Sequence, residues 1–207
     1  MPRTIEKTVF TYSELSEAAK EKARNWYRDD GGDNFRFAAE FVLEDAENMA
    51  RVMGIEIAHE KHGAKIYYSG FSSQGDGASF VGSYRYAKGA SKKIREEAPQ
   101  DAELHRIAGQ LQNIQSRHFY RIGATMSQGA GSNHYSHSHT MAVDVFDRED
   151  ERDFSDCEDE LSQLMRDFAD WIYSQLEKEY DWINEDAQVE ENIIANDYEF
   201  DEEGNIA

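Results

Sequence analysis

The segment from Gln74 to Gly77 (QGDG) has the residue types of a small ligand-binding loop. Its glycines, Gly75 and Gly77, can bring backbone N–H groups close to a ligand, and the Asp76 carboxylate can bind a cation or act as a base. The segment has neither the GxGxxG spacing nor the lysine of a GxxxxGK[ST] phosphate loop. Both glycines also suit a tight turn, where glycine adopts positive φ angles at little cost. The sequence therefore favours a structural loop and leaves ligand binding as an alternative.

Three histidines, His134, His137 and His139, fall within six residues. Imidazole is a common ligand of zinc and other transition metals. In an extended strand, His137 and His139 would point to the same face. The rest of a ligand set is missing, because the sequence has no HExxH motif and only one cysteine, Cys157. We therefore expect no metal and no other cofactor, and these histidines are the candidate ligands should a metal bind.

Carboxylates recur along the clearest predicted helix, which begins at Ser155. Its apolar positions from Leu161 to Leu176 follow helical spacing, and the carboxylates form a lengthwise stripe opposite them. An ordinary solvated face mixes lysine with glutamate, whereas this stripe contains hardly any basic residue. The candidate partner-binding residues on this helix and just after it are Glu160, Asp167, Asp170, Glu177, Asp181, Glu185 and Asp186.

The net charge of the chain is -20, and this excess lies entirely in the last third. Residues 141–207 carry 24 acidic and 4 basic side chains, whereas residues 55–140 carry 7 acidic and 10 basic ones. So much negative charge attracts cationic partners and opposes direct binding to nucleic acid, whose phosphates need Lys and Arg. We therefore expect a basic nucleic-acid-binding protein or complex as the partner, and no contact with nucleic acid or a membrane. A solvated acidic helix and tail without a partner is the simpler alternative.

Helical and strand patterns together predict an α+β fold. The capping-box pattern from Thr11 to Glu14 predicts the start of a first helix, and a second is predicted over 34–53. Aromatic-rich segments at 65–71 and 79–86 predict a hairpin, with further strands at 119–126 and 140–146. We expect an antiparallel sheet of about five strands packed with helices, plus a long acidic C-terminal helix and tail. The predicted division is an α+β core with N-terminal helices at 1–150 and an acidic helix and tail at 151–207, docked on the same domain.

Composition excludes several classes of protein. A chain of 207 residues with 39% hydrophobic and 12% aromatic residues can form a core and is too apolar to be wholly disordered. No stretch approaches the roughly 20 consecutive apolar residues of a membrane-spanning helix. The first residues lack the apolar segment of a secretory signal, and a single cysteine excludes a disulfide framework. We therefore expect a cytoplasmic protein.

Three segments resemble a family of phage and prophage proteins: YSELSEAAK at 12–20, YSGFSSQGDGASF at 68–80 and HYSH at 134–137. Members of this family often carry the description "antitoxin of a toxin–antitoxin system". The resemblance runs from about residue 9 to residue 146 and is strongest at 68–80. It implies an origin in a mobile element and a role directed at the host, and it assigns no catalytic residue.

These features predict a non-enzymatic acidic protein of a phage or mobile element that inhibits a basic, nucleic-acid-handling host defence protein. A CRISPR effector or a restriction enzyme is the expected target, by analogy with acidic phage inhibitors that mimic nucleic acid. One alternative is an antitoxin that neutralises a cognate toxin. A second is a metal- or nucleotide-dependent enzyme that uses the QGDG loop and the histidine cluster.

Overall fold

The computed structural model describes residues 6–30, 34–61, 63–128, 136–147 and 155–207. Helices account for 56% and strands for 21% of the structure, which confirms the predicted α+β class. The elements in chain order are β1 (Phe10–Thr11), η1 (Tyr12–Glu14), α1 (Glu17–Asp30), α2 (Asn34–Met53), β2 (Ile55–Ile57), β3 (His59–Glu60), β4 (Gly63–Ala64), β5 (Ile66–Ser69), β6 (Gly77–Phe80), β7 (Gly82–Arg85), α3 (Ala90–Glu97), α4 (Ala102–Arg117), β8 (Ile122–Gln128), η2 (Ser138–Thr140), β9 (Met141–Asp147), α5 (Ser155–Asn184), α6 (Asp186–Ala195) and β10 (Glu199–Phe200).

The chain forms two compact units. Unit 1 consists of Met1–Ala39 together with Lys178–Ala207, and unit 2 consists of Glu40–Glu177. Helices α2 and α5 each contribute residues to both units. Unit 1 contains segments from both ends of the chain, which pack together around one apolar core.

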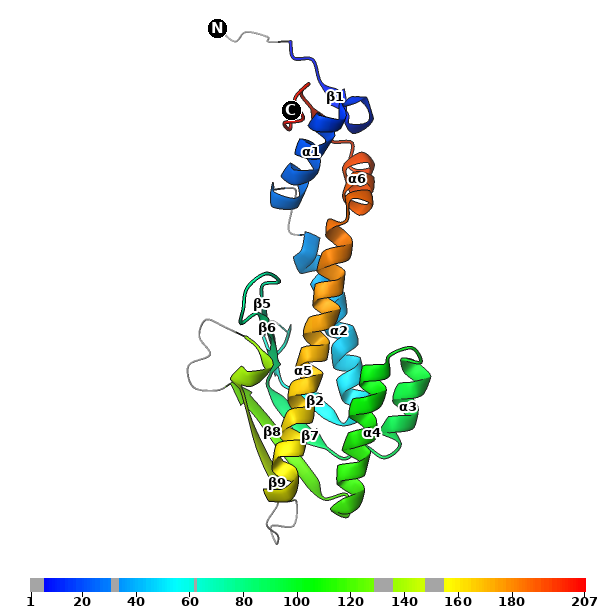
Figure 1. Cartoon of the computed structure of the whole chain (residues 1–207), viewed down its shortest axis with the longest axis vertical. Coiled ribbons are helices and arrows are strands. Elements are labelled where there is room, and N and C mark those ends of the chain that lie inside the picture. The colour runs from blue at the N-terminus through cyan, green and yellow to red at the C-terminus, as the bar shows by residue number, and fades with distance from the viewer. Residues whose placement is uncertain (1–5, 31–33, 62, 129–135, 148–154) are drawn as a thin grey trace. The chain divides into compact units, whose positions relative to one another are not determined.

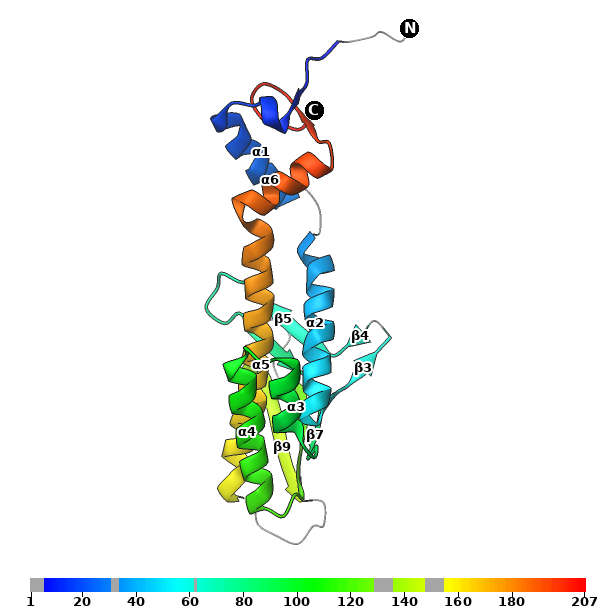
Figure 2. The same cartoon turned by 90° about the vertical axis from the view of Figure 1, so that its right-hand side faces the viewer.

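Unit 2 is built on an antiparallel sheet in the order β2-β7-β8-β9. Successive side chains of a strand point to opposite faces of the sheet. The side chains on one face are buried, and those on the other face are exposed or half-buried. One face holds the buried side chains of Ile55, Tyr84 and Ala124, which are aligned across three strands. The other holds the aligned residues Glu56, Ser83, Thr125 and Asp144, which are exposed or half-buried. Helices therefore cover one face of the sheet (Figures 1 and 2).

The predicted hairpin is present as β5 and β6, which pair from Ile66 opposite Phe80 to Ser69 opposite Gly77. These two strands form a ladder of their own, so the main sheet has four strands instead of the expected five or so. The strand predicted from Phe119 begins only at Ile122, because Phe119 and Tyr120 have φ angles of 53° and 63° and cannot extend it. The box from Thr11 to Glu14 starts the short η1 turn, and α1 begins later, at Glu17.

Two polar side chains connect the helices of unit 2. Asp101 caps α4 by accepting a hydrogen bond from the Leu104 backbone N–H at 2.9 Å, and its second oxygen accepts one from Trp171 Nε1 of α5 at 2.7 Å. The buried Gln115 of α4 donates from its side-chain amide to the Ile122 carbonyl at 2.7 Å. These contacts fix α4 against both α5 and the sheet.

Helix α5 has 30 residues, and its predicted apolar face is buried from Leu161 to Leu176. Much of the helix surface away from that face is exposed. None of the described helices combines the length and the apolar character that crossing a bilayer requires.

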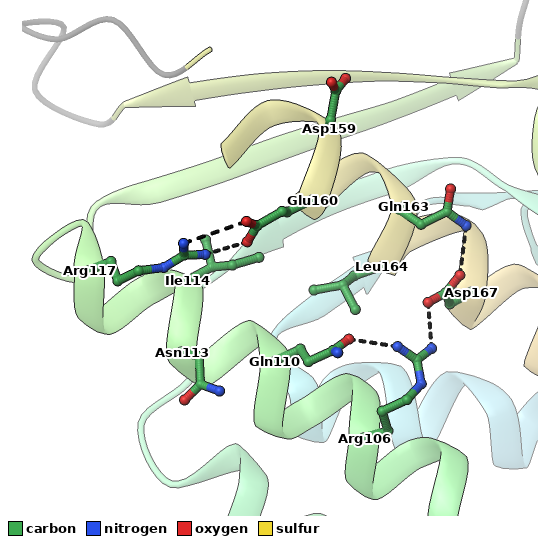
Figure 3. A pocket seen from close by; sticks show the side chains of 10 residues that line it. All are labelled: Arg106, Gln110, Asn113, Ile114, Arg117, Asp159, Glu160, Gln163, Leu164 and Asp167. Atoms are coloured by element: carbon green, nitrogen blue, oxygen red, sulfur yellow. Dashed lines mark hydrogen bonds and ion pairs between the residues drawn. The ribbon is translucent and has the colours of Figure 1, made fainter. Parts of the chain in front are cut away.

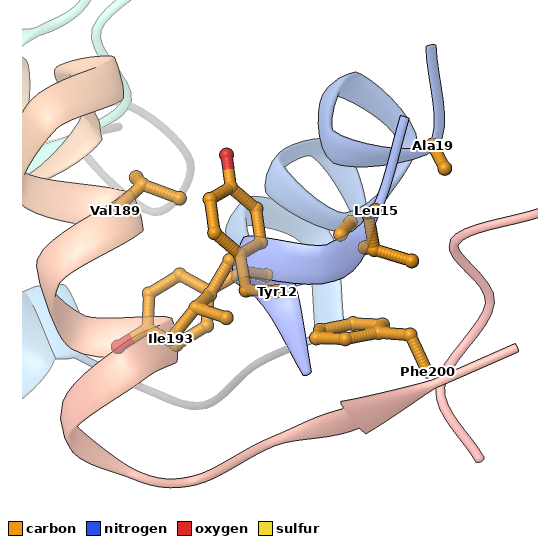
Figure 4. Packing of buried hydrophobic residues seen from close by; sticks show 8 residues of the cluster. Tyr12, Leu15, Ala19, Val189, Ile193 and Phe200 are labelled. Atoms are coloured by element: carbon orange, nitrogen blue, oxygen red, sulfur yellow. The ribbon is translucent and has the colours of Figure 1, made fainter. Parts of the chain in front are cut away.

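Unit 1 joins the two ends of the chain around one apolar core (Figure 4). The N-terminal segment contributes Tyr12, Leu15, Ala19, Ala23 and Tyr27, and the C-terminal segment contributes Val189, Ile193 and Phe200. Strands β1 and β10 pair antiparallel, with Phe10 opposite Phe200. Either segment alone would leave half of this core in water.

Arg24 connects the two segments of unit 1 electrostatically. Its guanidinium donates to Glu190 at 2.6 Å, to the Tyr12 hydroxyl at 3.1 Å and to Glu21. Arg28 pairs with Asp186 and lowers the pKa of that carboxyl group. A carboxyl group whose pKa is lower in the folded state stabilises the fold above its unfolded pKa, and this contribution is lost as the pH falls. The Arg28–Asp186 pair therefore stabilises unit 1 at neutral pH, and this contribution is lost at acidic pH.

We expect Phe200→Ala to lower the stability of unit 1 by about 3–5 kcal/mol, because it leaves a cavity in a fully buried core. Hydrogen–deuterium exchange should become faster in both α1 and α6. Ile206→Ala is the control, since this side chain is 40% exposed. Faster exchange confined to the C-terminal segment would contradict a core shared by the two ends.

Candidate functional site

A groove of about 830 Å³ runs between α4 and α5 within unit 2 (Figure 3). Ile114 and Leu164, both buried, supply its apolar part. The other lining residues are polar or charged and come from both helices: Arg106, Gln110, Asn113, Arg117, Asp159, Glu160, Gln163 and Asp167. The groove contains two of the predicted partner-binding carboxylates, Glu160 and Asp167.

Asp167 forms an ion pair with Arg106 of the same chain, so it is already partnered within the protein. Arg106 also forms an ion pair with Glu103 of its own helix at 2.5 Å, and it donates to Gln110 at 2.6 Å. Gln163 donates to the other oxygen of Asp167 at 2.7 Å. The Asp167 side chain is only 18% exposed. The hydrogen bond to Glu103, with the pairing to Asp167, raises the pKa of Arg106, so the guanidinium stays cationic. Asp167 therefore has a structural role and is a poor contact for a partner.

Arg117 pairs with Glu160 at the other end of the groove. Both side chains are 51% exposed, so water screens this pair and it contributes little to stability. Arg106 and Arg117 lie 11 residues apart on α4, which is about three helical turns and places them on one face. The sequence alone could have shown that these two arginines share one face of a helix. It could not have shown which helix they face, because that depends on tertiary packing.

The remaining predicted carboxylates separate by unit. In unit 2, Asp170 and Glu177 are exposed, and in unit 1 Asp181 and Glu185 are exposed. None of these four forms an ion pair with any side chain that the structure describes. Asp186 differs, because it pairs with Arg28 and lies 3.7 Å from Arg24.

The carboxylate of the QGDG loop is hydrogen-bonded to the backbone of its own loop. Asp76 accepts hydrogen bonds from the backbone N–H groups of Ser72 at 3.0 Å and Ser73 at 2.6 Å. Gly75 has a φ angle of 113°, as expected for a turn glycine. The expectation of a positive φ was wrong for Gly77, which is needed for space instead, since a Cβ atom there would lie 2.6 Å from the Cβ of His137. Gln74 is exposed.

The histidine cluster is only partly within the described residues, because His134 lies outside them. His137 lies just before η2 and His139 lies within it, and the strand predicted at 140–146 is present as β9 from Met141. The Nδ1 atom of His137 accepts a hydrogen bond from the backbone N–H of His139 at 3.2 Å. Among the described residues, no group of three or more His, Cys, Asp or Glu side chains is arranged to hold a metal ion.

Arg106→Gln should lower the free energy of unfolding by about 1–2 kcal/mol, because it removes the cation beside a mostly buried carboxylate. Arg117→Gln should cost less than about 0.5 kcal/mol, because its pair with Glu160 is exposed. Urea denaturation of both variants measures the difference. Equal costs would mean that Asp167 does not depend on Arg106.

Gly77→Ala should destabilise unit 2 by about 1–3 kcal/mol, since the added methyl group meets His137 in a packed site. Gly109→Ala is the matched control, because a Cβ atom at this helical position has no neighbour within 4 Å. That control should gain about 0.5–1 kcal/mol from helix propensity. A neutral Gly77→Ala would show that the η2 turn can move away from the hairpin.

No curated protein and no solved structure matches the chain. The model of a domain of unknown function, DUF8835, matches residues 39–186. This segment contains the whole of unit 2, including both helices that line the groove, and leaves out most of unit 1. Because the match covers well over half of the sequence, the chain belongs to the DUF8835 family.

Proposed function

We propose that this chain binds a basic, nucleic-acid-handling protein and covers the surface on which that protein holds its nucleic acid. A host defence protein, such as a CRISPR effector or a restriction enzyme, is the proposed target. Such a target implies that the protein comes from a phage or mobile element. The support for that origin is the sequence resemblance to phage and prophage proteins.

The observation that carries the proposal is a set of four exposed carboxylates that form no ion pair with the side chains the structure describes. These are Asp170 and Glu177 in unit 2 and Asp181 and Glu185 in unit 1, on a chain with a net charge of -20. Charge that is not paired within the chain is balanced by mobile cations, as it is on nucleic acid. A basic protein releases such cations when it binds, and this release favours association.

The spacing of the exposed carboxylates also supports the proposal. Asp170 and Glu177 lie seven residues apart, which is close to two full turns, so both face the same side of α5 at a separation of about 10 Å along its axis. Lys and Arg side chains that contact successive phosphates would meet carboxylates of the same sign there. Each exposed ion pair contributes only about 0–1 kcal/mol, so binding of this kind depends on many pairs together.

The two alternative functions, an antitoxin and an enzyme, are not equally supported. An antitoxin would use the same exposed carboxylates, with a basic toxin as its partner. An enzyme built on the QGDG loop and the histidines has less support, because Asp76 and His137 already accept backbone hydrogen bonds from their own loops.

Reversing the four exposed carboxylates should weaken partner binding at least 100-fold. The variant is Asp170→Lys, Glu177→Lys, Asp181→Lys and Glu185→Lys together, and it leaves Glu160 and Asp167 with their arginines. The matched control reverses Glu44, Glu56, Glu97 and Asp144, which are exposed elsewhere and change the net charge by the same amount. Proteins captured from cell lysate by the wild type and the control, but not by the variant, are the candidate partners.

Affinity for such a partner should fall as salt increases, because the Debye length shrinks from about 10 Å at 0.1 M to about 3 Å at 1 M. Duplex DNA should compete for the same surface of the partner. An affinity that is independent of salt, of DNA and of the fourfold reversal would refute the proposed function.

A further inference from the structure

Trp182 is the most exposed tryptophan of the chain. Its side chain is 51% exposed, whereas Trp171 is 8% exposed and stacks on Phe168 at 5.6 Å between ring centroids. Trp26 packs edge-on against Tyr198 and Phe200. Within the described residues, Trp182 makes no such ring contact. A large apolar side chain is therefore left in water near the end of α5.

The exposure of Trp182 follows from its position on α5. Leu164 precedes it by 18 residues and Trp171 by 11, which are five turns and about three turns, so all three lie on nearly the same stripe of the helix. Leu164 and Trp171 are buried within unit 2. Trp182 belongs to unit 1, where its side chain remains uncovered.

The sequence around Trp182 is strongly acidic. Asp181 precedes it and Glu185 follows it by three residues, and both are exposed. The backbone N–H of Glu185 donates to the Trp182 carbonyl at 3.2 Å, so the two residues lie on one turn of the backbone at the end of α5. Lys178, one turn earlier, is the last basic residue, and the 29 residues after it contain 11 acidic side chains and no Lys or Arg. The charge around the indole thus complements a cation.

We propose that Trp182 is the aromatic anchor of the partner interface and stacks on an arginine side chain of the basic partner. The inference rests on the proposed function and adds the residue that gives binding its specificity. A guanidinium over an indole face gains a cation–π interaction, for which tryptophan is the best side chain. Asp181 and Glu185 supply carboxylates for its N–H groups. Tryptophan and arginine are also the residue types that most often dominate interface energetics.

The test uses a peptide of eight arginines as the probe and the full-length protein at low salt. Acrylamide quenches exposed indoles, so quenching reports mainly on Trp182, and the peptide should protect this fluorescence. In isothermal titration calorimetry, which does not depend on the indole, Trp182→Ala should weaken peptide binding at least 10-fold, and Trp182→Phe should retain part of the affinity. Ile194→Ala is the matched control, because Ile194 is also 51% exposed in unit 1, and it should bind as the wild type does. A peptide of eight lysines should bind more weakly than the arginine peptide.

The outcomes separate this inference from the proposed function. If Trp182→Ala binds within 2-fold of the wild type while Asp181→Lys with Glu185→Lys abolishes binding, the anchor is refuted and the acidic surface stands. If the wild type does not bind the arginine peptide at all, both fail. If Trp182→Ala only converts a dimer into a monomer in light scattering, with peptide affinity unchanged, the indole contacts a second copy and the anchor is likewise refuted.

Discussion

Four arginines allow the acidic C-terminal helices to pack against the rest of a chain that carries a net charge of -20. In unit 2, Arg106 and Arg117 of α4 pair with Asp167 and Glu160 of α5. In unit 1, Arg24 and Arg28 of α1 pair with Glu190 and Asp186 of α6. Asp167 is only 18% exposed, so leaving it without its cation would be costly. The pairs made by Glu160 and Asp186 are more exposed, so they mainly offset the negative charge at the surface of these helices.

This constraint divides the acidic residues of the C-terminal third into two groups. Glu160, Asp167 and Asp186 are paired with arginines within the chain, and Asp167 is the most buried of the three. Asp170, Glu177, Asp181 and Glu185 are exposed and remain available to a partner. The division matters for function because reversing a paired carboxylate disturbs the fold, whereas reversing an exposed one changes only the surface charge.

The sequence predicted the local elements better than their partners. Hydrophobic period and turn chemistry located the long helix from Ser155 and the hairpin on both sides of the QGDG loop, because both signals are local. The pairing of β1 with β10 joins residues about 190 positions apart, and no local pattern specifies it. The same holds for Arg106 and Asp167, which look like solvated residues until α4 and α5 are brought together. Gly77 shows the limit for single residues, since its neighbour His137 comes from a segment 60 residues later.

The most direct test of this division is carbodiimide labelling of carboxylates, followed residue by residue with mass spectrometry. In the free protein, Asp170, Glu177, Asp181 and Glu185 should react quickly, and Asp167 should react slowly because it is mostly buried and paired with Arg106. Addition of an arginine-rich peptide should protect the four exposed residues and leave Asp167 unchanged. Rapid labelling of Asp167 in the free protein, or no protection of the four by the peptide, would contradict the account.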